Sequence, residues 1–127
     1  MSSFFTLVKK FLFPVNKPIN KPIESSIEDN SNGGISMKKV SIRVTGLVQG
    51  VGFRYSTKVV ADQFDVYGIV RNESDGSVYI EANGDEEKID KFIEKIRNSP
   101  SPSGQVDSIT VEELSSLPVR DKFIISN

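Results

Sequence analysis

One short segment of the chain combines three glycines with a cation, in the sequence GLVQGVGFR at residues 46–54. Glycine adopts backbone conformations that other residues resist, so a turn of this composition can aim several N–H groups at one point. Such a nest of amides suits an anion, and a helix that begins directly behind it adds partial positive charge. The segment therefore favours the binding of a phosphate-like group.

Arg54 is the residue of this segment that most needs an explanation. A cation in the first turn of a helix faces the helix dipole unfavourably, at a cost of about 0.3–1 kcal/mol. An anion between the guanidinium and the amides removes that conflict, because the planar fork of arginine matches phosphate oxygens. On local sequence alone, the alternative is a surface arginine beside a tight turn.

The glycine pattern does not match the nucleotide-binding motifs. A Walker A loop requires Gly-Lys followed by Ser or Thr, whereas Gly52 is followed by Phe53 and Arg54. A dinucleotide-binding fingerprint requires a third glycine where Tyr55 stands. We therefore expect a small phosphate-like ligand and not a nucleotide.

Asn72 is the second candidate, in the sequence GIVRNESDGSV. Asparagine is depleted in strands, so one at the end of an apolar run needs a reason. Its side-chain amide could both accept a hydrogen bond from a water molecule and donate one to it. The alternative is an asparagine that ends a strand before a turn, and without further context that alternative is favoured.

The composition excludes several kinds of chemistry. The chain has 127 residues and no cysteine or histidine, which removes disulfides, thiolate nucleophiles, Ser-His-Asp triads and most transition-metal sites. Lys and Arg number 16 and Asp and Glu 17, for a formal net charge of −1. This balance argues against binding to nucleic acid, which needs a basic face.

The elements that must position Arg54 and Asn72 follow from the apolar periodicity after residue 37. Residues 40–45 alternate as a half-buried strand, and Asp75-Gly76 is typical of a hairpin turn. The predicted helices are 54–66 and 85–98, and the other predicted strands are 67–73, 77–83, 107–114 and 122–126.

The helix predicted over residues 85–98 has the clearest pattern. Its apolar residues recur at helical spacing, acids crowd its first turn, and Lys95 and Arg97 lie in its last turn, as the helix dipole favours. Two helices with one apolar stripe each must cover one face of a mainly antiparallel sheet. The order predicts a ferredoxin-like βαββαβ two-layer α+β sandwich, with two helices on one face and a short extra C-terminal strand.

Residues 1–36 differ in composition from this domain, which we place at 37–127. Three prolines break any helix there and a Ser/Asn/Gly-rich tract follows, so we expect a flexible, disordered N-terminal extension. Contact with a membrane surface by residues 4–13 is an alternative. The apolar run does not match a secretory signal, because charges split it, and we expect a cytoplasmic protein.

Two blocks of the sequence resemble the acylphosphatase family. GLVQGVGFR at 46–54 is similar to the family's G-x-V-Q-G-V-x-F-R loop, and GIVRNESDGSVYIEANG at 68–84 is similar to its second block. The resemblance extends over about residues 38–126 and leaves the N-terminal extension unexplained. Ile69 departs from the family, which commonly has an aromatic residue there, and so does Leu47, where a basic or small residue is frequent.

The resemblance implies a function. Acylphosphatases are small ferredoxin-like enzymes that hydrolyse the carboxyl-phosphate bond of acyl phosphates to a carboxylate and inorganic phosphate, without a metal or organic cofactor. It implies that Arg54 holds the phosphoryl group together with the backbone of the loop, and that Asn72 orients the attacking water. The loop residues concerned are Gln49, Gly50, Val51, Gly52 and Phe53. It also implies a monomer with a small-molecule substrate and no nucleic acid.

Two other functions remain as alternatives. A binding module on the same fold is one, since the fold alone decides no function. An RNA-binding version would carry exposed aromatic residues on a basic sheet, whereas VRNESDGSVYIEA is acidic and has only Tyr79. The other is a domain that handles acyl or carbamoyl phosphate within a larger maturation enzyme.

Overall fold

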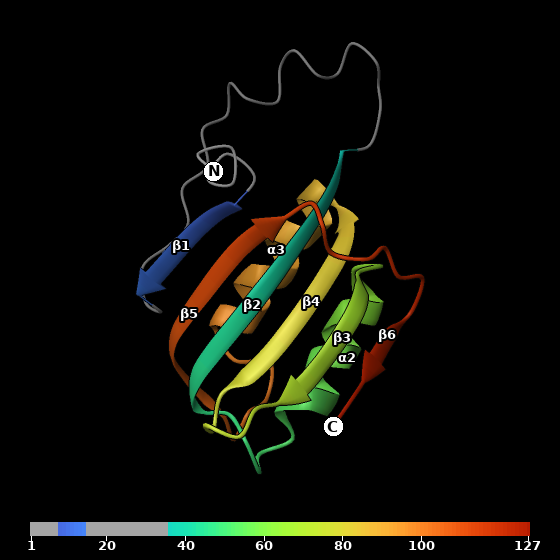
Figure 1. The fold of residues 1–127 in the computed structure, drawn as a ribbon. Coiled ribbons are helices and arrows are strands. Elements are labelled where there is room, and N and C mark those ends of the chain that lie inside the picture. The colour runs from blue at the N-terminus through green and yellow to red at the C-terminus, as the bar shows by residue number, and fades with distance from the viewer. Residues whose placement is uncertain (1–7, 15–35) are drawn as a thin grey trace.

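The computed structural model describes residues 8–14 and 36–127, which form six strands and two helices. Figure 1 shows them as one sheet with the helices behind it. The elements in chain order are β1 (Val8–Pro14), β2 (Met37–Leu47), α2 (Phe53–Gln63), β3 (Tyr67–Asn72), β4 (Val78–Asp85), α3 (Glu86–Arg97), β5 (Gln105–Leu114) and β6 (Phe123–Ile125).

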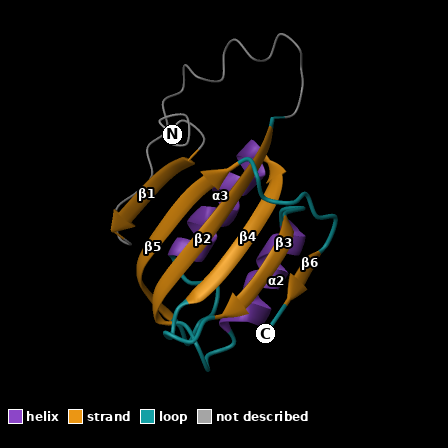
Figure 2. Ribbon diagram, viewed as in Figure 1, coloured by secondary structure: helices purple, strands orange, loops and turns teal. Residues whose placement is uncertain are grey.

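The sheet has the strand order β1-β5-β2-β4-β3-β6 in the described part of the chain. Neighbouring strands are antiparallel except for β3 and β6, which are parallel. β4 lies between β2 and β3, and β2 lies between β4 and β5, so each helix connects two strands that are separated by a third. Both helices cover the same face of the sheet (Figure 2). The predicted ferredoxin-like α+β sandwich and its short C-terminal strand are confirmed.

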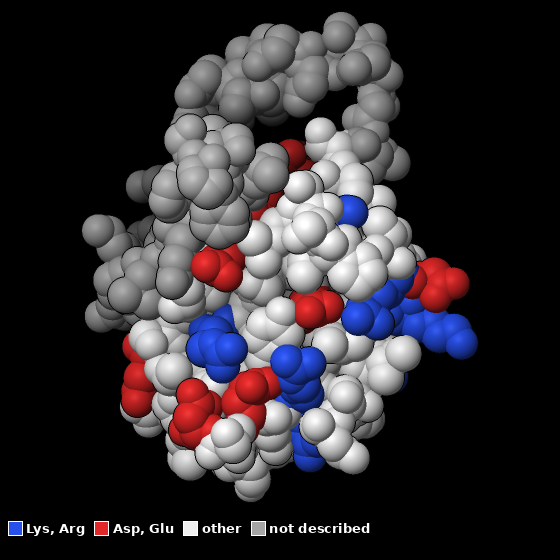
Figure 3. Space-filling model, in the orientation of Figure 1, with Lys and Arg blue, Asp and Glu red and all other residues white. Residues whose placement is uncertain are grey.

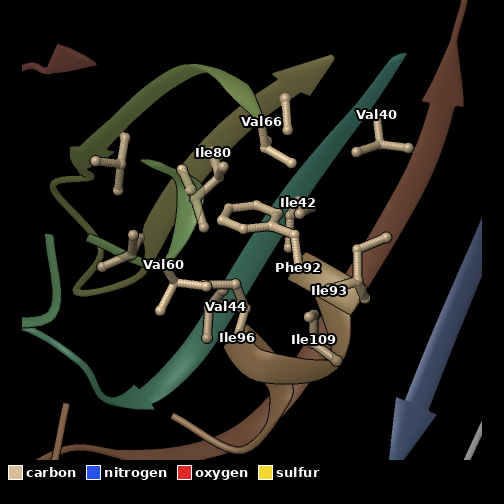
Figure 4. Close-up of a cluster of buried hydrophobic side chains, with 14 of the residues drawn as sticks. Val40, Ile42, Val44, Val60, Val66, Ile80, Phe92, Ile93, Ile96 and Ile109 are labelled. Atoms are coloured by element: carbon tan, nitrogen blue, oxygen red, sulfur yellow. The ribbon is translucent and has the colours of Figure 1, made fainter. Parts of the chain in front are cut away.

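The core lies between the sheet and the helices, where the predicted apolar stripes meet. Val40, Ile42 and Val44 of β2 are fully buried, as their alternation indicated. Figure 4 shows them facing the buried side chains of α3, including Phe92 and Ile96. Burial of this apolar surface fixes the register of the central strands, because a one-residue slip would turn every side chain to the opposite face.

The first helix ends earlier than the sequence pattern predicts. A helix was expected over residues 54–66, whereas α2 ends at Gln63. Asp65 adopts a left-handed conformation with a φ of 57°, and the Val66 N–H donates to the carbonyl of Ala61. This turn brings the side chain of Val66 into the core. The apolar residue that extended the helical pattern is therefore a buried loop residue.

The N-terminal part of the chain differs from the expected flexible extension at residues 8–14. Val8–Pro14 forms β1, which pairs antiparallel with β5 from Val8 opposite Leu114 to Pro14 opposite Ser108. An edge strand exposes unpaired backbone groups, and β1 supplies partners for those of β5. Residues 1–7 and 15–35 lie outside the described part, and nothing tests membrane contact by residues 4–13. None of the described helices has the length and apolar character needed to cross a membrane.

The sheet face away from the helices carries side chains of both charges (Figure 3). Tyr79 lies under two guanidinium groups, with Arg71 at 4.5 Å and Arg43 at 5.5 Å from its ring centre. Its hydroxyl donates to Glu81, and burial together with that acceptor raises the pKa of Tyr79 to about 12. On this face acids and bases are interspersed, unlike the continuous basic surface typical of nucleic-acid binding.

Candidate active site

A cavity of about 240 Å³ lies where the loop after β2, the start of α2, the end of β3 and the C-terminal strand β6 meet. Arg54 and Asn72, the two side chains singled out in the sequence, both line it. The full set of lining residues is Val48, Gly50, Gly52, Phe53, Arg54, Tyr55, Asn72 and Ile125. Segments far apart in the sequence therefore converge on one pocket.

The loop approaches the cavity through two glycines in left-handed conformations. Gly50 has a φ of 77° and Gly52 a φ of 79°, which other residues adopt at a cost. Gly52 is also the N-cap of α2, where no side chain accepts a hydrogen bond from the helix amides. The first turn of α2 contains no acidic residue. Free N–H groups and the positive end of the helix dipole thus face the cavity without a counter-charge from α2 itself.

The C-terminal segment positions Arg54 at this helix start. The guanidinium Nη1 donates to the carbonyl oxygen of Ser126 at 3.1 Å, the one hydrogen bond of this side chain within the described residues. The N–H of Ser126 in turn donates to the carbonyl of Val70 in β3 at 2.8 Å. Arginine has five N–H donors, so most of them remain available toward the cavity. The partner is a backbone carbonyl and therefore does not neutralise the cation.

Asn72 stands at the last position of β3, opposite Val78 of β4. Its Oδ1 atom is buried and has no hydrogen-bond partner among the described residues. An unpaired buried acceptor costs free energy, typically about 1–3 kcal/mol. A water molecule or ligand in the cavity that donates to this oxygen would remove that cost.

The side chain of Gln49 connects the loop to the hairpin that carries Asn72. Its Nε2 donates to the carbonyl of Glu73 at 2.8 Å and to that of Ser77 at 2.9 Å. Asp75 stabilises the same turn by accepting from the N–H and the hydroxyl of Ser77, and these hydrogen bonds lower the pKa of Asp75. The relative position of Arg54 and Asn72 therefore depends on the hydrogen bonds of Gln49 and Asp75, which belong to neither residue.

Most of the residues expected at the site line the cavity, but two do not. Gln49 directs its side chain to the hairpin, and the carbonyl of Val51 accepts a hydrogen bond from the hydroxyl of Ser101. Conversely, three lining residues and one backbone group were not expected from the sequence: Val48, Tyr55, Ile125 and the carbonyl of Ser126. An aromatic residue directly after Arg54 was the one local signal for Tyr55. Nothing local marked the other three.

The described residues offer no obvious metal site. No group of three or more Asp or Glu side chains is placed there to coordinate a metal ion. What the cavity presents is a cation, free backbone amides and a side-chain amide. These groups can bind a phosphoryl group and hold a water molecule beside it.

Comparison with known proteins identifies the family. The acylphosphatase family model matches residues 40–125. The acylphosphatase of Enterococcus faecalis is 51% identical over 87 residues, which is 68% of this chain and 96% of that protein. That of Lactiplantibacillus plantarum is 47% identical over 91 residues, which is 72% of this chain and all of that protein.

Solved structures agree with this match. The acylphosphatase of Bacillus subtilis superimposes with a TM-score of 0.68 and 39% identity, covering 72% of this chain and 100% of that one. Full-length HypF, solved with phosphate and nucleotide bound, gives a TM-score of 0.68 and 33% identity, and covers 74% of this chain but 12% of HypF. The chain therefore belongs to the acylphosphatase family of enzymes, which hydrolyse acyl phosphates.

Proposed function

We propose that Arg54 and the backbone amides of residues 49–54 hold the phosphoryl group of the acyl phosphate, and that Asn72 orients the attacking water. The observation that carries this proposal is the convergence of Arg54, the free start of α2 and the unpartnered Oδ1 of Asn72 on one cavity. A bound anion would account for Arg54 and the free start of α2, and a bound hydrogen-bond donor would account for the unpartnered Oδ1 of Asn72.

The chemistry requires little beyond positioning and charge stabilisation. The water oxygen attacks phosphorus, and the bond between phosphorus and the acyl oxygen breaks with its electron pair. The carboxylate leaves, and the proton of the water passes to a phosphate oxygen, giving inorganic phosphate. Phosphoryl transfer has a loose transition state whose charge spreads over the peripheral oxygens. Arg54 and the loop amides would stabilise that charge.

The leaving group explains why no strong general acid is needed. A carboxylate is stable without protonation, so no side chain has to donate to it. Asn72 would accept a hydrogen bond from the water through Oδ1 and hold it in line with the bond that breaks. Because the phosphate can take the proton, the absence of histidine from the chain does not conflict with this mechanism.

The first test compares the wild type with Arg54→Ala, using benzoyl phosphate in EDTA and following the ultraviolet absorbance. We expect turnover in EDTA and a loss of at least about 10²–10³-fold in kcat/KM in the variant, as for other lost transition-state contacts. Lys91→Ala, which removes an exposed cation on α3, is the matched control. Turnover by Arg54→Ala equal to that of the control would contradict the role of Arg54.

A second test separates the role of Asn72 from phosphate binding. Asn72→Ala should lower kcat by about 10²–10³-fold, because the water is no longer oriented. Competitive inhibition by inorganic phosphate should change little, since Arg54 and the loop are intact. Asn98→Ala, at the exposed end of α3, is the control. Full activity of Asn72→Ala, or a loss of phosphate inhibition as large as the loss of kcat, would rule out the water-orienting role.

We further propose that the enzyme works as a monomer, because the proposed mechanism needs no group beyond those that a single chain brings to the cavity. Light scattering after size-exclusion chromatography tests this proposal. The absence of nucleic-acid binding and the cytoplasmic location expected from the sequence stay predictions. A role in binding without hydrolysis is the alternative to the enzyme. Folded wild-type protein that binds phosphate but turns over no acyl phosphate would favour it.

A further inference from the structure

The cavity is also lined by apolar side chains that the phosphoryl group does not need to contact. Beside Arg54 and Asn72 it is lined by Tyr55, which is 67% exposed, and by Ile125, which is 38% exposed. Exposed apolar side chains are common on protein surfaces, so their exposure alone does not mark a site. Both belong to the same cavity as the groups that would bind phosphate, and this makes them candidates for substrate contact.

Their positions along the chain tie these two residues to the site. Tyr55 directly follows Arg54 in the first turn of α2. Ile125 directly precedes Ser126, whose carbonyl accepts the hydrogen bond from Arg54. A phosphoryl group held by Arg54 therefore has an aromatic ring supplied by one neighbouring segment and an aliphatic side chain supplied by the other.

The remainder of the substrate must lie next to its phosphoryl group, because a single bond joins phosphorus to the acyl oxygen. The polar groups of the cavity account for the phosphate and the water. Among the apolar lining residues, Val48 and Phe53 are buried in the core, so Tyr55 and Ile125 are left to face the acyl part. Apolar surfaces that meet are removed from water, which favours binding of an acyl group with an apolar body.

We propose that Tyr55 and Ile125 form an acyl subsite that favours acyl phosphates with an aromatic or extended aliphatic acyl group over small ones. The proposal rests on the proposed function, since it takes the phosphoryl group to lie at Arg54. It assigns the substrate class that the phosphate-binding residues alone leave open.

The test uses two substrates that share the phosphoryl group and differ in the acyl group, acetyl phosphate and benzoyl phosphate. Acetate and benzoate are leaving groups of similar basicity, so a difference in KM reports on the acyl contact. The wild type should have the lower KM for benzoyl phosphate. Tyr55→Ala and Ile125→Ala should each raise that KM by about 3- to 10-fold and leave the KM for acetyl phosphate within about twofold.

Two further variants make the result specific. Tyr55→Phe keeps the apolar ring and should keep the wild-type KM for benzoyl phosphate. Val59→Ala removes an exposed apolar side chain one turn further along α2, outside the cavity, and should change neither KM. Thermal melting of each variant checks that it is folded.

The possible results distinguish failure of the acyl subsite from failure of the proposed function. Equal KM values of the wild type for the two substrates would overturn the acyl subsite and leave the enzyme intact. So would an equal rise in KM for both substrates in Tyr55→Ala and Ile125→Ala, because that result would indicate damage to the phosphate-binding groups. If folded wild type hydrolyses neither substrate, the proposed function fails and the acyl subsite fails with it.

Discussion

The two helices of this fold begin in opposite ways. α3 starts with Asp85 as its N-cap and has Glu86 and Glu87 in its first turn. α2 starts with the left-handed Gly52, has no acid in its first turn and has Arg54 there instead. In both helices the N-terminal amides carry partial positive charge. α3 places its own carboxylates near that charge, whereas α2 leaves it unopposed.

This difference is what we expect if the start of α3 serves stability and the start of α2 serves the proposed phosphate binding. Carboxylates in the first turn of α3 stabilise the helix by roughly 0.3–1 kcal/mol each. At α2 the same interaction is absent and Arg54 adds an unfavourable one. A protein tolerates that arrangement where an external anion restores the balance, and the cavity lies at this end of α2. The comparison therefore supports phosphate binding at α2 without reference to the family.

The largest expected effect comes from making α2 begin like α3. Arg54→Glu should lower kcat/KM by more than about 10³-fold, because it removes the cation and places a carboxylate where the phosphoryl group would lie. The same change should leave the free energy of unfolding within about 1 kcal/mol of the wild-type value, because an acid suits the first turn of a helix and offsets the lost hydrogen bond from Arg54 to the Ser126 carbonyl. Steady-state turnover and urea unfolding measure the two quantities. A large drop in stability accompanying the loss of activity would contradict the comparison.

An intermediate effect is expected when the left-handed start of α2 is disturbed. Gly52→Ala should cost about 1–2 kcal/mol in stability, because alanine resists a φ of 79°. It should also raise the dissociation constant for inorganic phosphate, since the loop amides no longer aim at one point. Isothermal titration calorimetry measures the binding.

The matched variant at α3 is Asp85→Ala. Asp85 is the N-cap of α3, has an ordinary φ of −60° and makes no side-chain hydrogen bond to the helix. It should leave phosphate binding unchanged. Equal effects of Gly52→Ala and Asp85→Ala on phosphate binding would show that the start of α2 does not bind phosphate in preference to the start of α3.

The smallest effect is expected at the first turn of α3. Glu86→Gln and Glu87→Gln should each lower the free energy of unfolding by about 0.3–1 kcal/mol at low salt, and turnover should not change. High salt should shrink the loss, because both groups are at least partly exposed to solvent. Chemical unfolding at two ionic strengths provides the measurement. A change in KM would mean that α3 also influences the site.

The sequence predicted the elements whose signals are local. Alternation marked β2, the helical spacing of apolar residues marked α3, and Asp75-Gly76 marked the hairpin. β1 was missed because its pairing partner is β5, about a hundred residues away, and because Lys9-Lys10 and Pro14 obscure a strand pattern. The end of α2 was placed late because burial of Val66 in a loop looks the same in sequence as burial in a helix.

In the candidate site too, the residues with a local signal could be predicted and the long-range contacts could not. Arg54 could be singled out because its charge conflicts with the helix start, and Asn72 because it ends an apolar run; the family resemblance joined the two. Contacts across long sequence distances could not be seen. Gln49 was expected to contribute only its backbone, whereas its side chain bonds to carbonyls 24 and 28 residues away. The contact of Arg54 with the Ser126 carbonyl spans 72 residues.

The central claim, that the start of α2 binds the phosphoryl group, can be tested residue by residue. We would titrate isotopically labelled protein with inorganic phosphate and follow each backbone N–H signal by NMR. The account predicts saturable shifts at residues 49–54 and at the Asn72 side chain, and none at Glu86 and Glu87 in α3. Shifts at α3 as large as those of the loop, or a loop that does not respond to phosphate, would contradict it.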